Sequence, residues 1–345
     1  MKIIIDAMGG DNAPLEIVKG ALLGMEHWGV EVLLTGDTEA ILRALRDCGH
    51  DTIPHGMEIV HTTETVDMCD DPSKVFRHKK DTSMGVGLTL LRDGKADALV
   101  SAGSTGALLA GATLITKRIR GIRRAALAPV VPTGNGGAVL IDCGATADCT
   151  PEFLLQFAFM GSYYAEKVLG IENPRVALLN IGAEDSKGGE LQKAVYPLLK
   201  QAGEAGAINF TGNIEARDVP LGGADVVVAD GFSGNILLKG IEGTALFMAS
   251  MMKDMFKKNV LTKLAALLCM DGVKAFKKKM DYRETGGTAL IGLSKPVIKA
   301  HGSSDALAIR NAIRQAIGAV EADVAATLAA NMDHMVIPKE YQHAE

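Results

Sequence analysis

The sequence predicts an α/β protein whose doubly wound, mainly parallel sheet is sandwiched by helices. Three observations support this prediction. Short β-branched apolar runs recur along the chain without polar interruption, as in strands that are buried on both faces. Each run ends in a loop rich in Gly, Asp, Ser, Thr or Asn, and a helix-compatible stretch usually follows. Hydrophobic residues make up 48% of the 345 positions, which is enough for a large buried core.

The expected strands begin at the N-terminus and continue into the last quarter of the chain. The first, Ile3–Ile5, leads directly into a polar glycine loop that ends at Pro14. The uncharged stretch 98–116 is expected to form a strand, a loop and a helix rather than a membrane span, because serine, threonine and glycine interrupt it. In chain order, the expected strands are Ile3–Ile5, Val30–Leu34, Ala98–Val100, Ala138–Ile141, Val176–Leu179, a strand at Ile208, Val226–Val228 and Pro296–Ile298.

We expect a single α/β catalytic domain over residues 1–345. No linker is obvious, and the candidate weak points are the segments 129–137 and 203–206. An internal echo favours one repeated structural unit. The segment 96–109 aligns with the segment 224–237 in the form A-D-x-(L/V)-V-x-x-G-x-(S/T)-G-x-(L/I)-L. Duplication or convergence on one strand–loop–helix unit would explain it.

Charge and residue spacing disfavour several classes of protein. Lys and Arg number 36 against 41 Asp and Glu, and this net charge of −5 argues against a protein that coats nucleic acid. The five cysteines are scattered without a CxxC pair, and the histidines lack metal-site spacing. We therefore expect neither a metal nor a cofactor. Reduced thiols, and an N-terminus without an export signal, predict a cytoplasmic protein.

A lysine-rich segment at about 245–282 differs from the rest of the chain. Lysines alternate there with Met, Leu, Val and Phe, as in one or two amphipathic helices with a break near Asp271-Gly272. Two interpretations remain open. The helices pack on the core or form a dimer contact, or a basic, apolar face meets anionic lipid or an acidic partner protein.

The 39 glycines gather in loops that follow the expected strands. Glycine lets backbone N–H groups approach a ligand closely, and a following helix N-terminus favours negative charge. In open α/β sheets the ligand lies beyond the carboxyl ends of the strands, so several of these loops would face one crevice. Neither a Walker A sequence nor a complete dinucleotide pattern occurs, and a small anion such as phosphate fits better than a nucleotide.

The candidate site residues all come from these loops. Lys187 could neutralise an anion or an oxyanion, although a solvated lysine is the alternative, and His301 could act as an acid or base, although a lone histidine is more often structural. Asn235 is the third candidate catalytic residue. The candidate phosphate- or substrate-binding residues are Asp6, Gly9, Gly10, Asp11, Ser104, Thr105, Gly106, Asn180, Asp230, Ser233, Gly234, Gly302 and Ser303.

Six of these segments, taken in order, resemble the bacterial phosphate acyltransferases, which transfer acyl groups from acyl-[acyl-carrier-protein] to phosphate in phospholipid synthesis. The resemblance extends from the first residue to about residue 325. The segments are Met1–Pro14, Ser101–Gly106, Asn180–Gly182, Gly212–Glu215, Asp230–Asn235 and His301–Asp305.

The resemblance implies a fold similar to that of the isocitrate/isopropylmalate dehydrogenases and a homodimer. It implies acyl carrier protein as the acyl donor, inorganic phosphate as the acceptor, and an acyl phosphate that passes to a downstream membrane acyltransferase. It also implies peripheral association with the inner face of the cell membrane. The lysine-rich segment would then dock either an anionic membrane surface or the acidic carrier protein.

Phosphate is already a nucleophile, so it needs positioning more than deprotonation. Amides of the loops around Gly9-Gly10, Ser104–Gly106 and Ser233–Asn235 are expected to orient it. Lys187, Asn235 or backbone amides would stabilise the tetrahedral oxyanion, and His301 is the candidate general acid. No covalent enzyme intermediate is expected.

Three rival interpretations remain. A phosphotransacetylase-like enzyme would run the same chemistry on acyl-coenzyme A. An NAD-dependent decarboxylating dehydrogenase would need clustered aspartates and a cofactor loop, neither of which the sequence shows convincingly. A noncatalytic membrane-surface scaffold would use the basic amphipathic segment but would leave the glycine loops without a role.

Overall fold

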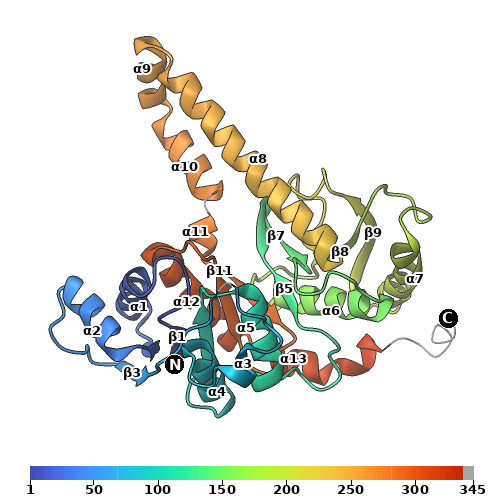
Figure 1. The fold of residues 1–345 in the computed structure, drawn as a ribbon. Helices are drawn as coiled ribbons and strands as arrows, with labels where there is room; N and C mark the ends of the chain where they lie inside the picture. Colours follow the sequence, from blue (N-terminus) through green and yellow to red (C-terminus); the bar gives the residue numbers. More distant parts are fainter. Residues whose placement is uncertain (68, 281, 337–345) are drawn as a thin grey trace.

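The computed structural model describes residues 1–67, 69–280 and 282–336. It confirms the α/β class and the predominance of parallel pairing, but the strands are divided between two sheets (Figure 1). Some residues of the expected domain lie outside the described residues. They include residue 281 of the amphipathic segment and the C-terminal residues 337–345.

The first sheet has seven strands in the order β3-β2-β1-β4-β12-β11-β5, and its first five strands are parallel to one another. Its strands are β1 (Lys2–Asp6), β2 (Glu31–Gly36), β3 (Met57–His61), β4 (Ala98–Ser101), β5 (Ala126–Ala128), β11 (Gly287–Ile291) and β12 (Val297–Ala300). The second sheet has five strands in the order β6-β7-β10-β8-β9, of which only β6 is antiparallel to its neighbour. Its strands are β6 (Val130–Thr133), β7 (Gly136–Ile141), β8 (Arg175–Asn180), β9 (Asn209–Glu215) and β10 (Val226–Val228).

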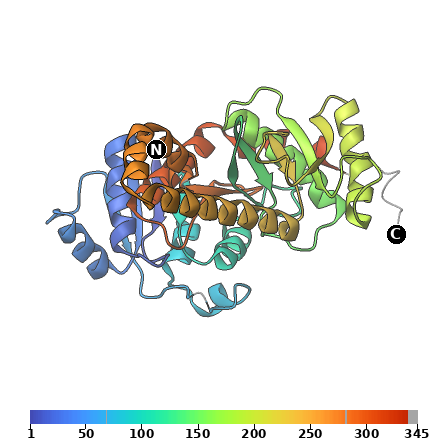
Figure 2. The ribbon, with the colours of Figure 1, turned by 90° about the horizontal axis from the view of Figure 1, so that it is seen from above.

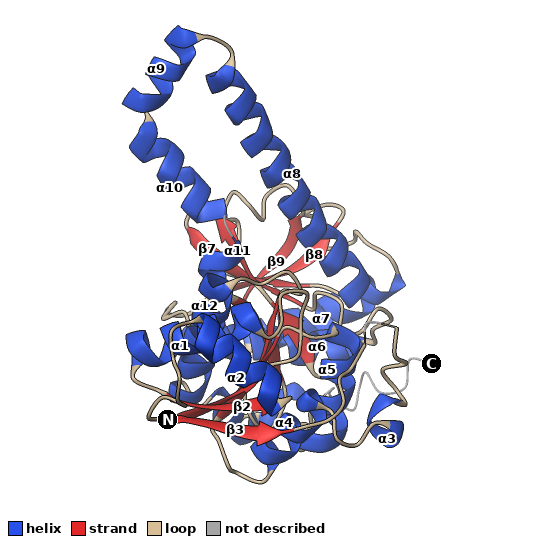
Figure 3. Ribbon diagram, turned by 60° about the vertical axis from the view of Figure 1, so that its left-hand side comes forward, coloured by secondary structure: helices blue, strands red, loops and turns tan. Residues whose placement is uncertain are grey.

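Helices cover the faces of both sheets (Figure 3). The helices of the first half are α1 (Leu15–Trp28), α2 (Thr38–Asp47), α3 (Val75–His78), α4 (Ser83–Arg92), α5 (Thr105–Gly111), a π-helical turn (Ala112–Thr116) and α6 (Pro151–Lys167). The second half holds α7 (Glu190–Glu204), α8 (Gly231–Lys257), α9 (Val260–Leu268), α10 (Met270–Met280), α11 (Tyr282–Thr285), α12 (Ala306–Glu321), α13 (Val324–Ala330) and a 3₁₀ turn (Met332–Met335).

The unbroken apolar runs of the sequence are explained by helices on both sides of each strand. In β1, Ile3 and Ile5 join the core formed with α1 and α12, whereas Ile4 between them joins the core formed with α4. Successive side chains of a strand point to opposite faces, so a strand covered on both faces is apolar at every position. The second sheet has α6 and α7 on one face, and the apolar cluster of its other face includes Leu237 and Leu238 from the start of α8.

The chain crosses between the sheets twice within the described residues. It passes from β5 to β6 at Pro129, inside the expected weak point 129–137, where the structure has a β-hairpin instead of a linker. It returns from β10 to β11 through α8–α11. One apolar cluster contains strands of both sheets together with α6 and α12, and we propose on that basis that the chain folds as one domain.

Helices α8, α9 and α10 form a hairpin that protrudes from the two sheets (Figure 1). Seen from above, α8 crosses the middle of the molecule between the N-terminal strands and the region of α7 (Figure 2). A break lies close to the expected position near Asp271-Gly272, because α9 ends at Leu268 and α10 begins at Met270, with Cys269 between them. A second break follows α8, where the Asn259 side chain caps α9.

The apolar side chains of the hairpin are not covered by the rest of the chain. Val260 is 81% exposed and Leu268 is 85% exposed. The hairpin therefore does not pack on the core as one of the two interpretations supposed. Other exposed apolar side chains on it are Leu246, Phe247, Met251, Met255, Leu261, Leu264 and Leu267.

Four strands are absent from the expected set: β3, β5, β6 and β11. Strands β5, β6 and β11 are either very short or carry a proline or glycine, whereas β3 has Glu58 between its apolar residues. Strand β5 is the tripeptide Ala126–Ala128, and β6 contains Pro132. These segments form strands because of where they lie in the sheets. Strand β6 is an edge strand, where proline is tolerated. Strand β5 is ordered by its pairing with β11.

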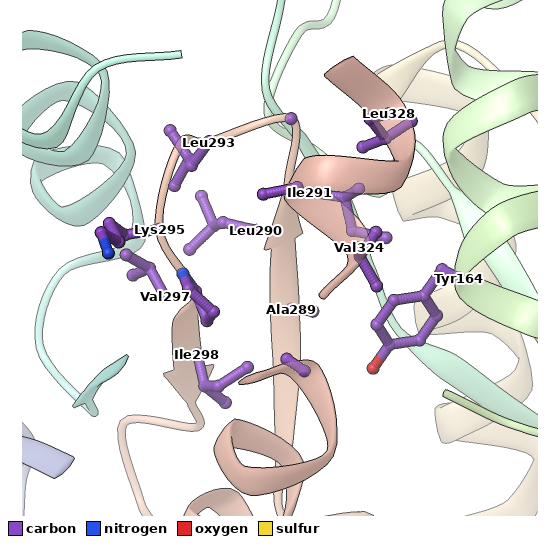
Figure 4. A pocket seen from close by; sticks show the side chains of 14 residues that line it. Tyr164, Ala289, Leu290, Ile291, Leu293, Lys295, Val297, Ile298, Val324 and Leu328 are labelled. Carbon is purple, nitrogen blue, oxygen red and sulfur yellow. The ribbon is translucent and has the colours of Figure 1, made fainter. Parts of the chain in front are cut away.

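A small internal cavity of about 40 Å³ lies between β11, β12 and α13 (Figure 4). Leu290, Val297 and Leu328 are among the apolar side chains around it. Tyr164 of α6 also lines it, and its hydroxyl donates to Gln315 Oε1 at 3.1 Å.

The start of α8 generates a stability prediction. A Cβ at Gly234 would collide with the carbonyl oxygen of Asp142, whereas a Cβ at Gly243, in the same helix, would meet open space. We expect Gly234→Ala to lower the free energy of unfolding by about 1–3 kcal/mol through overpacking, and Gly243→Ala to raise it by about 0.5–1 kcal/mol through helix propensity. Urea unfolding of both variants measures this, and a Gly234→Ala midpoint at or above that of Gly243→Ala would contradict it.

Candidate active site

The carboxyl ends of parallel strands from both sheets meet at a cleft of about 790 Å³, here called the central cleft. This is the crevice that the glycine loops predict. The structure brings together seven of the expected site residues in its lining: Gly10, Asp11, Ser104, Thr105, Asn235, His301 and Gly302.

Asp6 lies behind the cleft wall rather than in it. Its carboxylate, which is 1% exposed, accepts hydrogen bonds from the hydroxyls of Ser83 at 2.6 Å and Ser101 at 2.7 Å. Burial raises the pKa of Asp6, and the two serine hydrogen bonds oppose that rise. Asp6 therefore joins β1 to β4 and α4 and shapes the cleft wall from behind.

Asp142 performs the same task in the second sheet, at the end of β7. Its buried carboxylate accepts hydrogen bonds from the backbone amides of Leu127 at 2.8 Å and Thr146 at 2.7 Å. Burial raises the pKa of Asp142, and these backbone hydrogen bonds oppose the rise. Asp142 was not among the site residues expected from the sequence, although it is the polar residue that directly follows a buried apolar strand.

Two glycines are required beside Asp6. A Cβ at Gly9 would lie 2.5 Å from Asp6 Oδ2. Gly10 has a φ of +106°, and a Cβ there would be 3.0 Å from the Gly302 carbonyl oxygen. The adjacent Asp11 amide donates to that carbonyl at 2.8 Å, so the loop after β1 and the loop after β12 are joined.

Lys299, near the end of β12, is a cleft residue that the sequence analysis missed. Its side chain is buried and lines the cleft, and its ammonium group contacts the carbonyl oxygens of Ala102 and Ala300. Burial lowers the pKa of Lys299 to about 8, although the carboxylates of Asp6 and Asp11 favour its charged form. A lysine that interrupts an apolar run just before the loop at His301 is the sequence signal that could have found it.

His301 follows at the start of the next loop and also lines the cleft. The Ser303 backbone amide donates to His301 Nδ1 at 3.2 Å, so this nitrogen carries the lone pair and the neutral ring holds its proton on Nε2. Burial, followed by the positive charge of Lys299, lowers the pKa of His301. Neutral imidazole is accordingly the favoured form near pH 7, and it can donate one hydrogen bond from Nε2.

The loop that begins α8 is used mainly for capping. Asp230 accepts a hydrogen bond from the Ser233 amide at 2.8 Å, and the Gly234 amide donates to the Asp230 carbonyl at 2.9 Å. These two amides are therefore committed within the helix start. Asn235 is the member of this loop that lines the cleft.

The loop after β4 occupies the opposite wall. Ser104 caps α5 by accepting from the Ala107 amide at 3.5 Å, and the Gly103 amide donates to the Ser101 hydroxyl at 3.1 Å. Thr105 follows in the first turn of α5 and also lines the cleft, whereas Gly106 does not. The two halves of the internal echo thus lie in different sheets, and both reach the same cleft.

Asn180, the last residue of β8, and Lys187, on the loop that follows, lie apart from the central cleft. The Asn180 side chain donates to the Lys187 carbonyl at 3.1 Å and to Asn213 Oδ1 at 3.1 Å. The Lys187 ammonium group is 4.0 Å from Glu184 in an exposed pair. Asn180 and Ser233 line a second, apolar cavity of about 1080 Å³ beneath α8, called here the apolar cavity.

The cysteines near the cleft are poor nucleophiles. Cys143 lines the cleft, and burial raises the pKa of its thiol. Burial raises the pKa of Cys149 to about 12. Within the described ranges, no three His, Cys, Asp or Glu side chains are grouped so that they could hold a metal ion. No helix in the described part of the chain combines the length and apolar composition needed to span a membrane.

Comparison of the cleft-bearing chain with known proteins places it in a family. The family model described as "Fatty acid synthesis protein" matches residues 1–327. The protein named phosphate acyltransferase from Thermoanaerobacterium thermosaccharolyticum is 50% identical over 94% of each chain. The one from Alkaliphilus oremlandii is 51% identical over 92% of this chain and 93% of its own.

Solved structures support the fold. A phosphotransacetylase from Streptococcus pyogenes superposes with a TM-score of 0.59 at 21% identity and covers 94% of each chain. A 4-hydroxythreonine-4-phosphate dehydrogenase from Klebsiella pneumoniae gives a TM-score of 0.53 at 16% identity, over 93% of this chain and 99% of that one. Both share a mainly parallel α/β architecture with this chain, which by its sequence relatives belongs to the phosphate acyltransferase family of acyltransferase enzymes.

Proposed function

We propose that this protein transfers a fatty acyl group from acyl-[acyl-carrier-protein] to inorganic phosphate and so forms an acyl phosphate for phospholipid synthesis. The observation that carries the proposal is the buried Lys299 in a cleft walled by loops of both sheets. A desolvated cation at this place suits a small anion better than a water-exposed lysine would. The names of the half-identical relatives supply the reaction class.

In this proposal, phosphate sits against the wall formed by the first sheet. The Lys299 ammonium group neutralises part of its charge, and Thr105, at the first turn of α5, contributes a polar contact from the same wall. The cradle of Gly9 and Gly10 keeps the wall free of side chains. A phosphate oxygen is thereby held for approach to the face of the thioester carbonyl carbon.

Attack by phosphate forms a carbon–oxygen bond and places a negative charge on the former carbonyl oxygen. Asn235, across the cleft, and the Nε2–H of His301 are the proposed donors to this oxyanion. Collapse breaks the carbon–sulfur bond and releases the carrier thiolate, which takes a proton from water. The lowered pKa of His301 favours this donor role over the role of a charged general acid. The raised thiol pKa of Cys143 supports direct transfer without an acyl-enzyme.

The test of this function uses the purified full chain. Acyl-[acyl-carrier-protein] and inorganic phosphate should give free carrier protein together with an acyl phosphate that hydroxylamine traps as a hydroxamate. Omission of phosphate should abolish both products. Efficient turnover of acyl-coenzyme A, with none of the carrier-protein thioester, would favour the phosphotransacetylase-like alternative, and phosphate-independent behaviour with both donors would refute the proposal.

Lys187 provides a prediction about a residue outside the cleft. We propose that it contacts the incoming donor from outside the central cleft when the thioester is bound, and Lys187→Ala should then reduce turnover, as kcat/KM for the donor, at least about tenfold with folding intact. Lys200→Ala is the matched control, since Lys200 is an exposed lysine that pairs with Asp185 at 3.6 Å near the same loop. Turnover of Lys187→Ala equal to that of the control would remove Lys187 from the mechanism.

Lys299 provides a prediction about pH. Its ammonium group is present below its pKa of about 8 and lost above it, so kcat/KM for phosphate should fall as pH rises through about 8. Bound phosphate favours the charged lysine, so the corresponding fall in kcat should occur at a higher pH.

Lys299→Met should reduce kcat/KM for phosphate at least about 100-fold and remove this alkaline limb. Lys295→Met is the control, because Lys295 precedes the same strand but lines the small internal cavity. An unchanged alkaline limb in Lys299→Met would assign the titration to another group.

We further propose that the protein is a cytoplasmic homodimer and that the α8–α10 hairpin docks on the anionic inner face of the cell membrane, where the product passes to a downstream acyltransferase. The exposed leucines of α9 support this part of the proposal, since Leu267 is 64% exposed beside Leu268.

Leu267→Glu combined with Leu268→Glu should abolish flotation with liposomes that contain anionic lipid, because membrane docking would then require burial of two carboxylates in the lipid. Leu221→Glu changes an equally exposed leucine outside the hairpin and should leave flotation unchanged. Full flotation of the double variant would favour docking of the acidic carrier protein on the hairpin instead.

A further inference from the structure

The apolar cavity beneath α8 has no role in the steps described above. It lies between α8, the carboxyl ends of β8 and β9, and a side chain of α10. Arg217 is the only charged residue in its lining within the described part of the chain. The apolar members of the lining include Leu179, Ile181, Ile236, Leu237, Met248 and Phe276.

The apolar cavity adjoins the central cleft. Pro132, Ile241 and Ala245 line both spaces, so the two are separated by no more than one layer of side chains from β6 and α8. A molecule with a polar reactive end and an apolar tail could therefore place the end beside Asn235 and the tail along α8. The central cleft is the more polar of the two spaces and the second cavity is the more apolar one, which matches a polar end followed by an apolar tail.

The length of the apolar wall matches a long alkyl chain. From Ile236 to Met248 the helix advances 12 residues, or roughly 18 Å at about 1.5 Å per residue. An extended chain of tetrahedral atoms advances about 1.2 Å per bond, as follows from about 3.6 Å per three-bond peptide residue. The wall thus accommodates about 15 bonds, which is the length of a 16-carbon acyl chain.

We propose that the apolar cavity binds the fatty acyl chain of the donor and that the α8 residues along it set the preferred chain length. The inference rests on the proposed function, because it assigns the tail of the same substrate. Each methylene that enters an apolar site raises affinity by about fourfold, so selectivity for long chains follows from the length of the apolar wall along α8.

Two glycines of α8 allow a matched test. Gly240 lines the apolar cavity and Gly243 lines neither cavity, yet a Cβ added at either position meets open space. A phenylalanine at Gly240 would start from a Cβ in open space and place its ring at the wall of the apolar cavity, in the proposed path of the acyl chain. A phenylalanine at Gly243 changes helix propensity and side-chain bulk by the same amount, but it leaves the path of the acyl chain open.

The experiment measures kcat/KM for carrier-protein thioesters with 6, 8, 12 and 16 carbons. Gly240→Phe should lower the ratio of the 16-carbon to the 6-carbon value at least about tenfold relative to wild type, since burial of even two methylenes is worth about 16-fold. Gly243→Phe should keep the wild-type ratio. A Gly240→Phe profile parallel to that of wild type would overturn the inference while the proposed function stands.

A second measurement tests the inference if Gly240→Phe is inactive with every thioester, so that no chain-length profile can be obtained. The fluorescent fatty acid cis-parinaric acid should bind the wild type and Gly243→Phe, should be displaced by palmitate, and should bind Gly240→Phe at least about tenfold more weakly. Equal binding by both variants, or a change of oligomeric state confined to Gly240→Phe, would assign the apolar cavity to another occupant such as a second copy of the chain. An inactive wild type that still binds the probe would count against the proposed function alone.

Discussion

A buried carboxylate behind each wall of the central cleft is the interaction on which the site depends. Asp6 and Asp142 each follow the apolar part of a strand, one in each sheet, and each holds the neighbouring loops through short hydrogen bonds. A buried carboxylate without partners is costly, so these bonds leave the loops little freedom. Gly9 and Gly234 fit against these anchored groups, and side chains there would push the walls apart.

The two sheets contribute different groups to the central cleft. The first sheet supplies a desolvated cation through Lys299 and a neutral histidine through His301. The second sheet supplies Asn235 and, through α8, the boundary with the apolar cavity. A reaction that joins a phosphate to an acyl group needs a polar subsite next to an apolar one. Helix α8, which starts at Gly231, forms the boundary between two such spaces and lines both of them.

The sequence predicted the strands whose apolar runs were unbroken and the loops that follow them, because both-face burial leaves a direct signature in residue type. It could not predict that these strands belong to two sheets, since the pattern of Val226–Val228 is the same in either sheet. Lys299 was missed because one lysine near a strand end has no periodic signal, and its burial depends on the fold around it. The position of Lys187 relative to the cleft was equally invisible, because it depends on how the loop after β8 is folded back by Asn180.

The α8 helix is continuous from the cleft to the far end of the hairpin, so a tilt of this helix about its start would move its two ends by different amounts. Its 27 residues span about 40 Å. A displacement of about 3 Å at the far end tilts the helix by only about 5°, and the turns next to Asn235 then shift by less than about 1 Å. Catalytic alignment is sensitive on that smaller scale. A contact at the far end of the hairpin would thus shift the position of Asn235 in the cleft slightly, without any rearrangement of the sheets.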